Sequence, residues 1–172
     1  RDRVGLDADT AVSRRAVSLA QQGRFREAIA CFDQVLERDP KNVKMWNNKG
    51  VFFDILDRED DALACWKEAL SIDPGFAPAW ISRGMLHRRR NRLEDALNCY
   101  DRALALAPDS TIAWYNRSGV FIAMSQLADA IDCYEQVLSI DPHFIAAWID
   151  LGYAYFLKHQ HEEAIKCYDR VI

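Results

Sequence analysis

Residues 43–76 read VKMWNNKGVFFDILDREDDALACWKEALSIDPGF, and variants of this stretch fill most of the chain. Its cysteine, first tryptophan, first alanine and proline all recur at one constant step of about 34 residues. The recurring residues include Cys31, Cys65, Cys99, Cys133 and Cys167, together with Trp46, Trp80, Trp114 and Trp148. A fixed period of this length is the sequence signature of a repeat architecture. The chain therefore consists of tandem copies of one structural unit.

Each unit is predicted to form two helices joined by a short turn. In the quoted unit, apolar residues recur at helical spacing over residues 45–56 and form a second stripe over residues 62–70. Residues 57–60 interrupt the two stripes. Pro74 ends the second helix because it lacks an N–H and disfavours helical geometry in the residue before it. No segment shows the sustained alternation that is typical of a strand.

These residues resemble the tetratricopeptide signature, in which Trp-x2-Leu-Gly-x2-Tyr is followed by Ala-x3-Phe and then by Pro. The residues of the last unit that match are Trp148, Leu151, Gly152, Tyr155, Ala164 and Tyr168. Those of the quoted unit are Trp46, Gly50, Phe53, Ala62, Trp66 and Pro74. The resemblance covers residues 9–172, which is nearly the whole chain.

The resemblance implies an all-α fold, a right-handed α-solenoid of stacked antiparallel helix hairpins with about five units and ten helices. We predict an N-terminal flank at residues 1–8 and a single array at residues 9–172. The predicted repeat boundaries are 9–42, 43–76, 77–110, 111–144 and a truncated 145–172. No hairpin of this kind buries its apolar face alone, so stacking has to supply the core.

Three slots depart from the signature. The leucine slot holds a basic residue in four of the five units, at Arg15, Lys49, Arg83 and Arg117. We expect their stems to lie on apolar surface while their charges stay in solvent. Ser118 replaces a glycine, which leaves the close approach of the two helices in that unit open. His87 occupies an aromatic slot, where we expect a structural role.

The bulk composition excludes several classes of function. The 172 residues include 22 basic and 26 acidic side chains, and a net charge of −4 argues against a nucleic-acid partner. The longest uncharged run, residues 118–128, is too short to span a bilayer. We find no secretory signal after Arg1. Because there is no initiator Met, we expect the chain to be a piece of a longer protein.

No group of residues predicts catalysis, a cofactor or a metal. The cysteines lie a whole repeat apart, whereas zinc sites use close pairs, so we interpret them as small packing residues. Their unpaired state favours a reducing, cytoplasmic location. His159 and His161, followed by two glutamates, are interpreted as a solvated turn and not as a metal site. There is no glycine-rich phosphate loop and no nucleophile-base grouping, so we expect no enzymatic activity.

The strongest charge cluster is the basic run Arg88, Arg89, Arg90 and Arg92. It fits a solvated helix end, where basic side chains complement the helix dipole. It also fits a docking patch for acidic residues of a partner. The sequence leaves both readings open.

The resemblance implies that the first helix of each hairpin lines a concave groove that binds a partner. The predicted binding residues are Asn47, Asn48, Val51, Met85, Arg88, Arg89, Tyr115, Asn116, Ile122, Ile149, Tyr153 and Phe156. The N-terminal half of this set is polar and the C-terminal half is apolar and aromatic. We expect Asn48 and Asn116 to bind a partner's backbone and the aromatic residues to anchor its apolar side chains. The alternative is that some of these side chains pack within the array.

The sequence thus predicts a scaffold or adaptor that binds protein segments, with no nucleic acid and no membrane as partner. Two alternatives stay open: a recognition arm of a larger enzyme or signalling protein, and a self-assembling scaffold. Because the chain stops at Ile172, we expect the face near Ala164, Tyr168 and Val171 to be exposed and to promote self-association through uncapped repeat ends. A basic clamp for chaperone tails is not expected, since only Asn48 and Asn116 match it.

Overall fold

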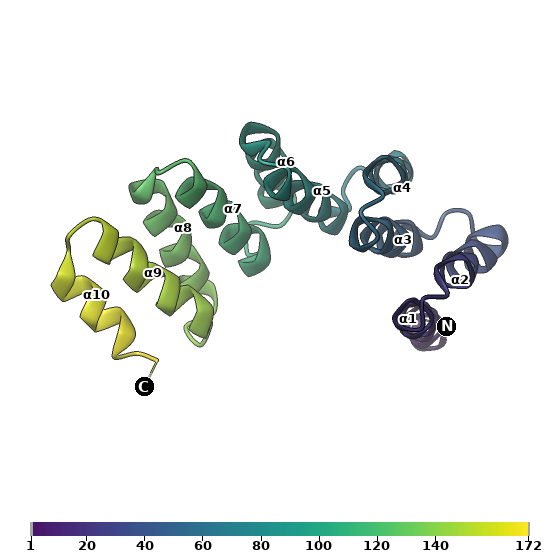
Figure 1. Ribbon diagram of the computed structural model, residues 1–172, viewed down its shortest axis with the longest axis horizontal. Coiled ribbons are helices and arrows are strands. Elements are labelled where there is room, and N and C mark those ends of the chain that lie inside the picture. The colour runs from purple at the N-terminus through teal and green to yellow at the C-terminus, as the bar shows by residue number, and fades with distance from the viewer. Residues whose placement is uncertain (1, 172) are drawn as a thin grey trace. The chain divides into compact units, whose positions relative to one another are not determined.

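The computed structural model describes residues 2–171, and its side chains from residue 10 onwards, as a succession of helices with no strand among them (Figure 1). The helices are α1 Asp2–Gln21, α2 Phe25–Arg38, α3 Val43–Ile55, α4 Glu59–Ile72, α5 Ala77–Arg89, α6 Leu93–Leu106, α7 Thr111–Ala123, α8 Leu127–Ile140, α9 Ile145–Leu157 and α10 His161–Tyr168. The predicted all-α repeat fold is confirmed. None of the described helices is long and apolar enough to cross a membrane.

The helices pair as the repeat predicts, with α1 against α2, α3 against α4, α7 against α8 and α9 against α10. The exact repeat boundaries and the flank at residues 1–8 stay predictions. Arg1 and Ile172, the outer limits of that prediction, lie outside the described residues. The chain divides into two compact units, residues 1–82 and residues 83–172.

The turn inside every hairpin contains one residue in the left-handed backbone region. These residues are Gly23, Asp57, Asn91, Ser125 and His159, with φ between 57° and 75°. They occupy the same position in successive repeats, so the turn recurs as faithfully as the helices do. Left-handed geometry strongly favours glycine, yet four of the five residues carry side chains. Composition therefore gives little sign of this recurring turn geometry.

The in-phase tryptophans and prolines are joined by hydrogen bonds. The indole N–H of Trp46 donates to the Pro40 carbonyl at 2.9 Å, and Trp114 and Trp148 bond to Pro108 and Pro142 at the same distance. Trp80 makes the same bond, at 3.4 Å, to Pro74. Each bond ties the start of a first helix to the loop that precedes it. This link explains why the two residue types recur together.

Each unit has its own core, built from the in-phase small residues and the apolar stripes. In residues 1–82 the core contains Ala16, Leu19, Ala28, Phe32, Leu36, Met45 and Phe52. In residues 83–172 a core cluster contains Phe121, Ala130, Ile131, Cys133, Tyr134, Val137, Leu138, Ala147, Leu151, Ala154 and Cys167. Both clusters draw residues from several helices, as stacking requires.

Ala164 corrects one prediction about the C-terminal face. This residue was expected to be exposed together with Tyr168 and Val171. The structure leaves Ala164 only 4% exposed, because it packs inside the α9–α10 hairpin like the alanines of the other units. Tyr168 is exposed and Val171 is half-buried.

Two of the four basic residues in the leucine slot, Lys49 and Arg117, also correct an expectation. Their charged ends do not simply remain in solvent. Lys49 Nζ lies 2.6 Å from a carboxylate oxygen of Asp33, and Arg117 Nε lies 2.9 Å from one of Asp101. Each partner belongs to the preceding repeat. Lys49 and Arg117 therefore connect neighbouring repeats instead of only covering apolar surface.

Close approach within a hairpin depends on a residue without bulk on the first helix. A Cβ placed on Gly50 would lie 2.5 Å from Nε1 of Trp66, a side chain with no exposed surface. Gly84 and Gly152 face a tyrosine ring in the same way. Ser118 fills the equivalent place in α7, where it is fully buried and its hydroxyl donates to the Tyr115 carbonyl at 2.6 Å. The polar group of this buried serine is therefore satisfied within its own helix.

We predict that Gly50→Ala lowers the free energy of unfolding by roughly 1–2 kcal/mol, because the added methyl meets a ring that has no free space. Gly152→Ala is the matched control. Its clash is with Tyr168, which is 37% exposed and has room to swing outward. Urea unfolding followed by circular dichroism measures both variants. A loss for Gly152→Ala as large as that for Gly50→Ala would contradict the explanation.

Candidate functional site

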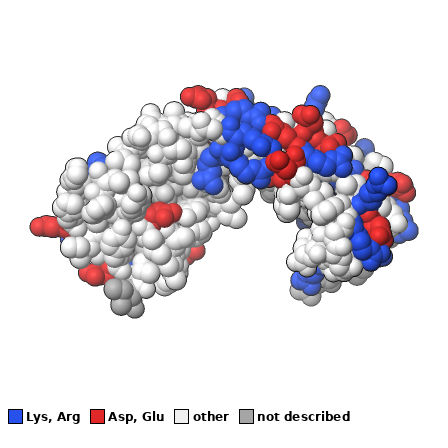
Figure 2. Space-filling model, viewed as in Figure 1, with Lys and Arg blue, Asp and Glu red and all other residues white. Residues whose placement is uncertain are grey.

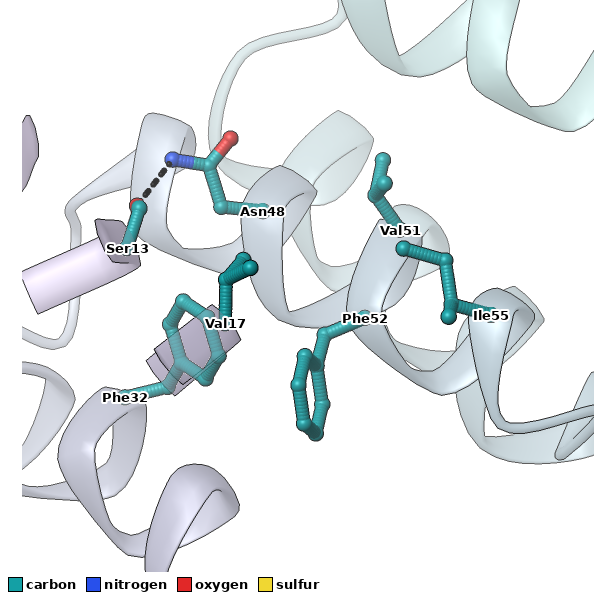
Figure 3. A pocket seen from close by; sticks show the side chains of 7 residues that line it. All are labelled: Ser13, Val17, Phe32, Asn48, Val51, Phe52 and Ile55. Atoms are coloured by element: carbon teal, nitrogen blue, oxygen red, sulfur yellow. Dashed lines mark hydrogen bonds between the residues drawn. The ribbon is translucent and has the colours of Figure 1, made fainter. Parts of the chain in front are cut away.

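The first helices of residues 1–82 form a small apolar hollow on their exposed side (Figure 3). Its volume is about 180 Å³. The lining residues are Ser13 and Val17 of α1, Phe32 of α2, and Asn48, Val51, Phe52 and Ile55 of α3. The Phe32 and Phe52 rings pack with their centroids 5.6 Å apart, which gives the hollow a firm base.

This hollow corrects the expected polar character of the N-terminal half. Val17 is 47% exposed and Ile55 is 68% exposed, so aliphatic surface dominates there. Neither residue was among the predicted binding residues. Val17 could have been predicted from the sequence, because it occupies the same position in the first repeat as Val51 does in the second.

The two asparagines predicted for this half bond across the repeats. Asn48 Nδ2 donates to Ser13 Oγ at 3.0 Å, as drawn in Figure 3, and Ser82 Oγ donates to Asn47 Oδ1 at 3.2 Å. Asn47 is only 9% exposed, so it offers little surface to a partner. Asn48 is half-buried and uses one of its two N–H donors in this bond.

In residues 83–172, α9 presents an exposed apolar stripe. Ile149, Tyr153 and Phe156 are 44%, 51% and 52% exposed. Their spacing of four and three residues places them on one face of the helix. Ile145, which was not predicted, extends the stripe by one turn. Exposed aromatic side chains on a rigid helix are efficient contacts for a partner because they bury large areas with few rotatable bonds.

Tyr115 joins α7 to α9. Its hydroxyl donates to Asp150 Oδ2 at 2.7 Å, and its ring packs against Phe144 at 5.1 Å and Tyr134 at 6.0 Å between centroids. Burial, followed by the bond to Asp150, raises the pKa of the Tyr115 phenol well above its usual range. Tyr115 is half-buried, so much of this predicted anchor serves the packing of the unit.

Arg88 lies across Gly119 of α7. A Cβ at Gly119 would collide with Nη1 of Arg88, so the glycine provides the space in which the guanidinium rests. Met85, one turn earlier on α5, is 46% exposed. The predicted Ile122 is half-buried, and Asn116 Nδ2 donates at 2.8 Å to the Ile112 carbonyl of its own helix. Arg88 therefore contacts α7, whereas Asn116 uses one of its N–H donors within its own helix.

The basic run begins in the last turn of α5. Arg88 and Arg89 belong to that turn, and the run continues through the turn that contains Asn91. Figure 2 shows lysine and arginine side chains gathered over α5 and α6, whereas few charged side chains appear over α7 to α10 on this face. This position agrees with a helix end and leaves a docking role open, because Arg88 and Arg89 are exposed.

The cysteines pack within the array, and His159 and His161 are exposed side chains that contact neighbouring rings. All five cysteines are free, and all but the half-buried Cys31 are buried. Burial raises the pKa of the Cys65 thiol to about 11, which disfavours the reactive thiolate. His159 and His161 stack edge to face at 6.1 Å, and His161 also packs on Phe156 at 5.6 Å. Among the described residues no group of three possible metal ligands comes together.

Three tetratricopeptide repeat family models match the chain, at residues 13–77, 77–110 and 121–172. The chain belongs to the tetratricopeptide repeat family. Proteins with this fold are protein-interaction scaffolds. The comparison with curated proteins gave no match.

Solved structures of tetratricopeptide proteins resemble the chain over most of its length. MamA is 28% identical, with a TM-score of 0.77 over 91% of this chain and 91% of that chain. PilW, described as a widely conserved type IV pilus biogenesis factor, is 25% identical, with a TM-score of 0.78 over 99% and 77% of the two chains. PilF of Pseudomonas aeruginosa, at 20% identity, shares the fold with a TM-score of 0.82 over 96% and 75%.

We predict that Tyr115 and Asp150 are energetically coupled. A double-mutant cycle with Tyr115→Phe and Asp150→Ala should give a coupling free energy on the order of 1 kcal/mol, which is typical of one hydrogen bond. Urea unfolding of the four proteins measures it. Additive effects of the two substitutions would show that the bond adds nothing to stability.

The raised pKa of the Tyr115 phenol predicts that the stability of the protein depends on pH. Its folded-state pKa is raised above the unfolded value of about 10, so its contribution to stability is complete below about pH 10 and is lost as the pH rises towards the folded pKa. Tyr115→Phe should therefore lose less stability than the wild type above about pH 10. Parallel alkaline loss in the two proteins would contradict this assignment.

Proposed function

We propose that the chain is a scaffold or adaptor that binds segments of partner proteins through its first helices. The observation that carries this proposal is the exposed stripe of Ile149, Tyr153 and Phe156 on α9. Membership of a family of interaction scaffolds supports it.

Residues 83–172 offer both apolar and charged contacts to such a partner. The α9 stripe supplies apolar area, and Met85 adds a flexible side chain that adapts to differently shaped partners. The guanidinium of Arg88, a residue of α5, lies against Gly119 of α7 and supplies a positive charge. A segment that combines apolar side chains with a nearby acidic one fits this arrangement, since opposite charges improve both encounter and register.

Residues 1–82 offer a second contact. The hollow lined by Val17, Val51 and Ile55 accepts a single branched apolar side chain, while Asn48 at its edge retains polar groups for a partner's backbone. This contact differs from the α9 stripe in being concave and aliphatic. We therefore propose that apolar side chains of a partner are recognised in both units.

A cytoplasmic location is part of the same proposal. Its support is the presence of five cysteines that are all unpaired, four of them within packed hairpins. Unpaired cysteines persist in reducing compartments, whereas oxidising compartments favour disulfides.

We predict that Tyr153→Glu weakens binding at least about tenfold, because it places a carboxylate in the middle of the apolar contact. The ligands are peptides selected from a random display library on the wild-type protein, and fluorescence anisotropy measures their affinities. Ile165→Glu is the matched control, since Ile165 is a comparably exposed apolar residue on α10.

Peptides selected in this way should bind Ile165→Glu as well as they bind the wild type. Thermal unfolding curves check that both variants remain folded. Peptides that ignore Tyr153→Glu, or that are lost equally with Ile165→Glu, would show that the α9 stripe is not the binding surface.

A further inference from the structure

A second arrangement of side chains recurs on another side of the hairpins. It lies between the second helices of two consecutive repeats, with the intervening first helix as its floor. In the second repeat, Lys49 of α3 fills this place. Its Nζ lies 5.3 Å from the Trp46 ring and 5.7 Å from the Phe53 ring, and 2.6 Å from a carboxylate oxygen of Asp33 on α2. The Lys49 ammonium group therefore lies between two aromatic rings and a carboxylate.

The fourth repeat has the same arrangement at the equivalent positions. The Arg117 guanidinium lies 5.5 Å from the Trp114 ring and 4.8 Å from the Phe121 ring. Its Nε contacts Asp101 of α6 at 2.9 Å, and its Nη1 donates to Cys133 Sγ of α8 at 3.3 Å. Two repeats therefore bind one of their own basic side chains between a tryptophan, a phenylalanine and an acid.

The fifth repeat keeps the surroundings but changes the central residue. Trp148 and Tyr155 stand where Trp114 and Phe121 stand one repeat earlier, and Glu135 stands in place of Asp101. The central residue is Leu151, which is short, uncharged and 3% exposed. The result is an open hollow of about 420 Å³ on α8, α9 and α10. We call it the α8–α10 hollow.

The charges around the α8–α10 hollow remain those of a cation site. Glu135 and Glu163 line it, against the single positive charge of Lys166. The Tyr155 hydroxyl donates to Glu135 Oε1 at 3.0 Å and holds that carboxylate at the rim. No lysine or arginine among the described residues stacks on Tyr155. Arg170 lies 5.7 Å from the Trp148 ring, but it does not line the hollow.

The causes that shift the pKa values of the buried cysteine thiols differ between the repeats in the same way. Burial raises the pKa of Cys133, and the Arg117 guanidinium acts in the opposite direction. Lys49 has the same opposing effect on the pKa of Cys65. At Cys167 burial and then the two glutamates all raise the pKa, and no basic group opposes them. The Cys167 side of the α8–α10 hollow therefore lacks the basic side chain that opposes the effect of burial at the equivalent thiols.

We propose that the α8–α10 hollow binds an arginine side chain of a partner protein. A guanidinium stacks on aromatic faces and donates to carboxylates in a fixed plane, as Arg117 does in the preceding repeat. Trp148 and Tyr155 supply the faces, and Glu135 and Glu163 supply the carboxylates. This site is independent of the surface proposed above, because Trp148, Leu151 and Tyr155 lie on a different face of α9 from Ile149, Tyr153 and Phe156.

The probe for this site is N-acetyl-arginine methylamide, with the citrulline analogue as its uncharged counterpart. In a nitrogen–proton correlation spectrum, the Trp148 indole resonance should shift saturably with the arginine amide and should not shift with the citrulline amide. The Trp46 and Trp114 resonances should stay in place, because their own basic side chains fill the equivalent sites. Equal shifts with the citrulline amide, or shifts spread over all the tryptophans, would overturn the proposal.

Two substitutions test the assignment by filling the α8–α10 hollow and by emptying the equivalent site of the fourth repeat. Leu151→Arg should place a guanidinium of the chain itself in the α8–α10 hollow and abolish the Trp148 response. Arg117→Leu should open the equivalent place in the fourth repeat and transfer a response to Trp114. Lys49→Leu tests the same transfer at Trp46 if Arg117→Leu does not fold. A Trp148 response that survives in Leu151→Arg, or a silent tryptophan in the opened repeat, would count against the assignment.

Discussion

The array depends on one contact, which is the meeting of a small residue on each first helix with an aromatic ring on the second. Gly50 against Trp66 shows how tight the contact is, because even a methyl group has no place there. Once the two helices lie this close, the in-phase alanines are enclosed and the apolar stripes face the next hairpin. The tryptophan bond to the preceding proline carbonyl then sets where the following first helix begins. Stacking of the repeats follows from these local contacts.

Residues that keep the repeat period have packing roles, and this separates structure from function along the chain. The cysteines, the alanines and most of the tryptophans are buried or half-buried at equivalent places. The surfaces that differ between repeats are the ones that we propose for recognition. The α9 stripe and the aliphatic hollow beside Ile55 lie where exposed positions of the repeat hold large apolar residues. The α8–α10 hollow arises where a packing slot loses its basic side chain.

Much of the fold could be predicted from the sequence, because period and helical spacing are local properties. The helix pairs and the packing role of the cysteines follow from them. The side-chain pairs between repeats could not be predicted in this way. Asn47 bonds to Ser82 of the next repeat and Lys49 to Asp33 of the preceding one, so these bonds depend on how hairpins stack. The left-handed turn residues were also missed, since Ser125 and His159 are poor indicators of such a backbone.

The in-phase tryptophans, each of which is bonded to a proline carbonyl, can also serve as fluorescence reporters of the individual repeats. Trp46, Trp114 and Trp148 donate to their proline carbonyls at 2.9 Å, Trp80 does so at 3.4 Å, and all four are half-buried, so each one reports on the repeat to which it belongs. In repeat proteins each unit is stabilised chiefly by its neighbours, and the ends can fray before the middle. Variants that retain a single one of these indoles would therefore resolve, repeat by repeat, the order in which the array melts.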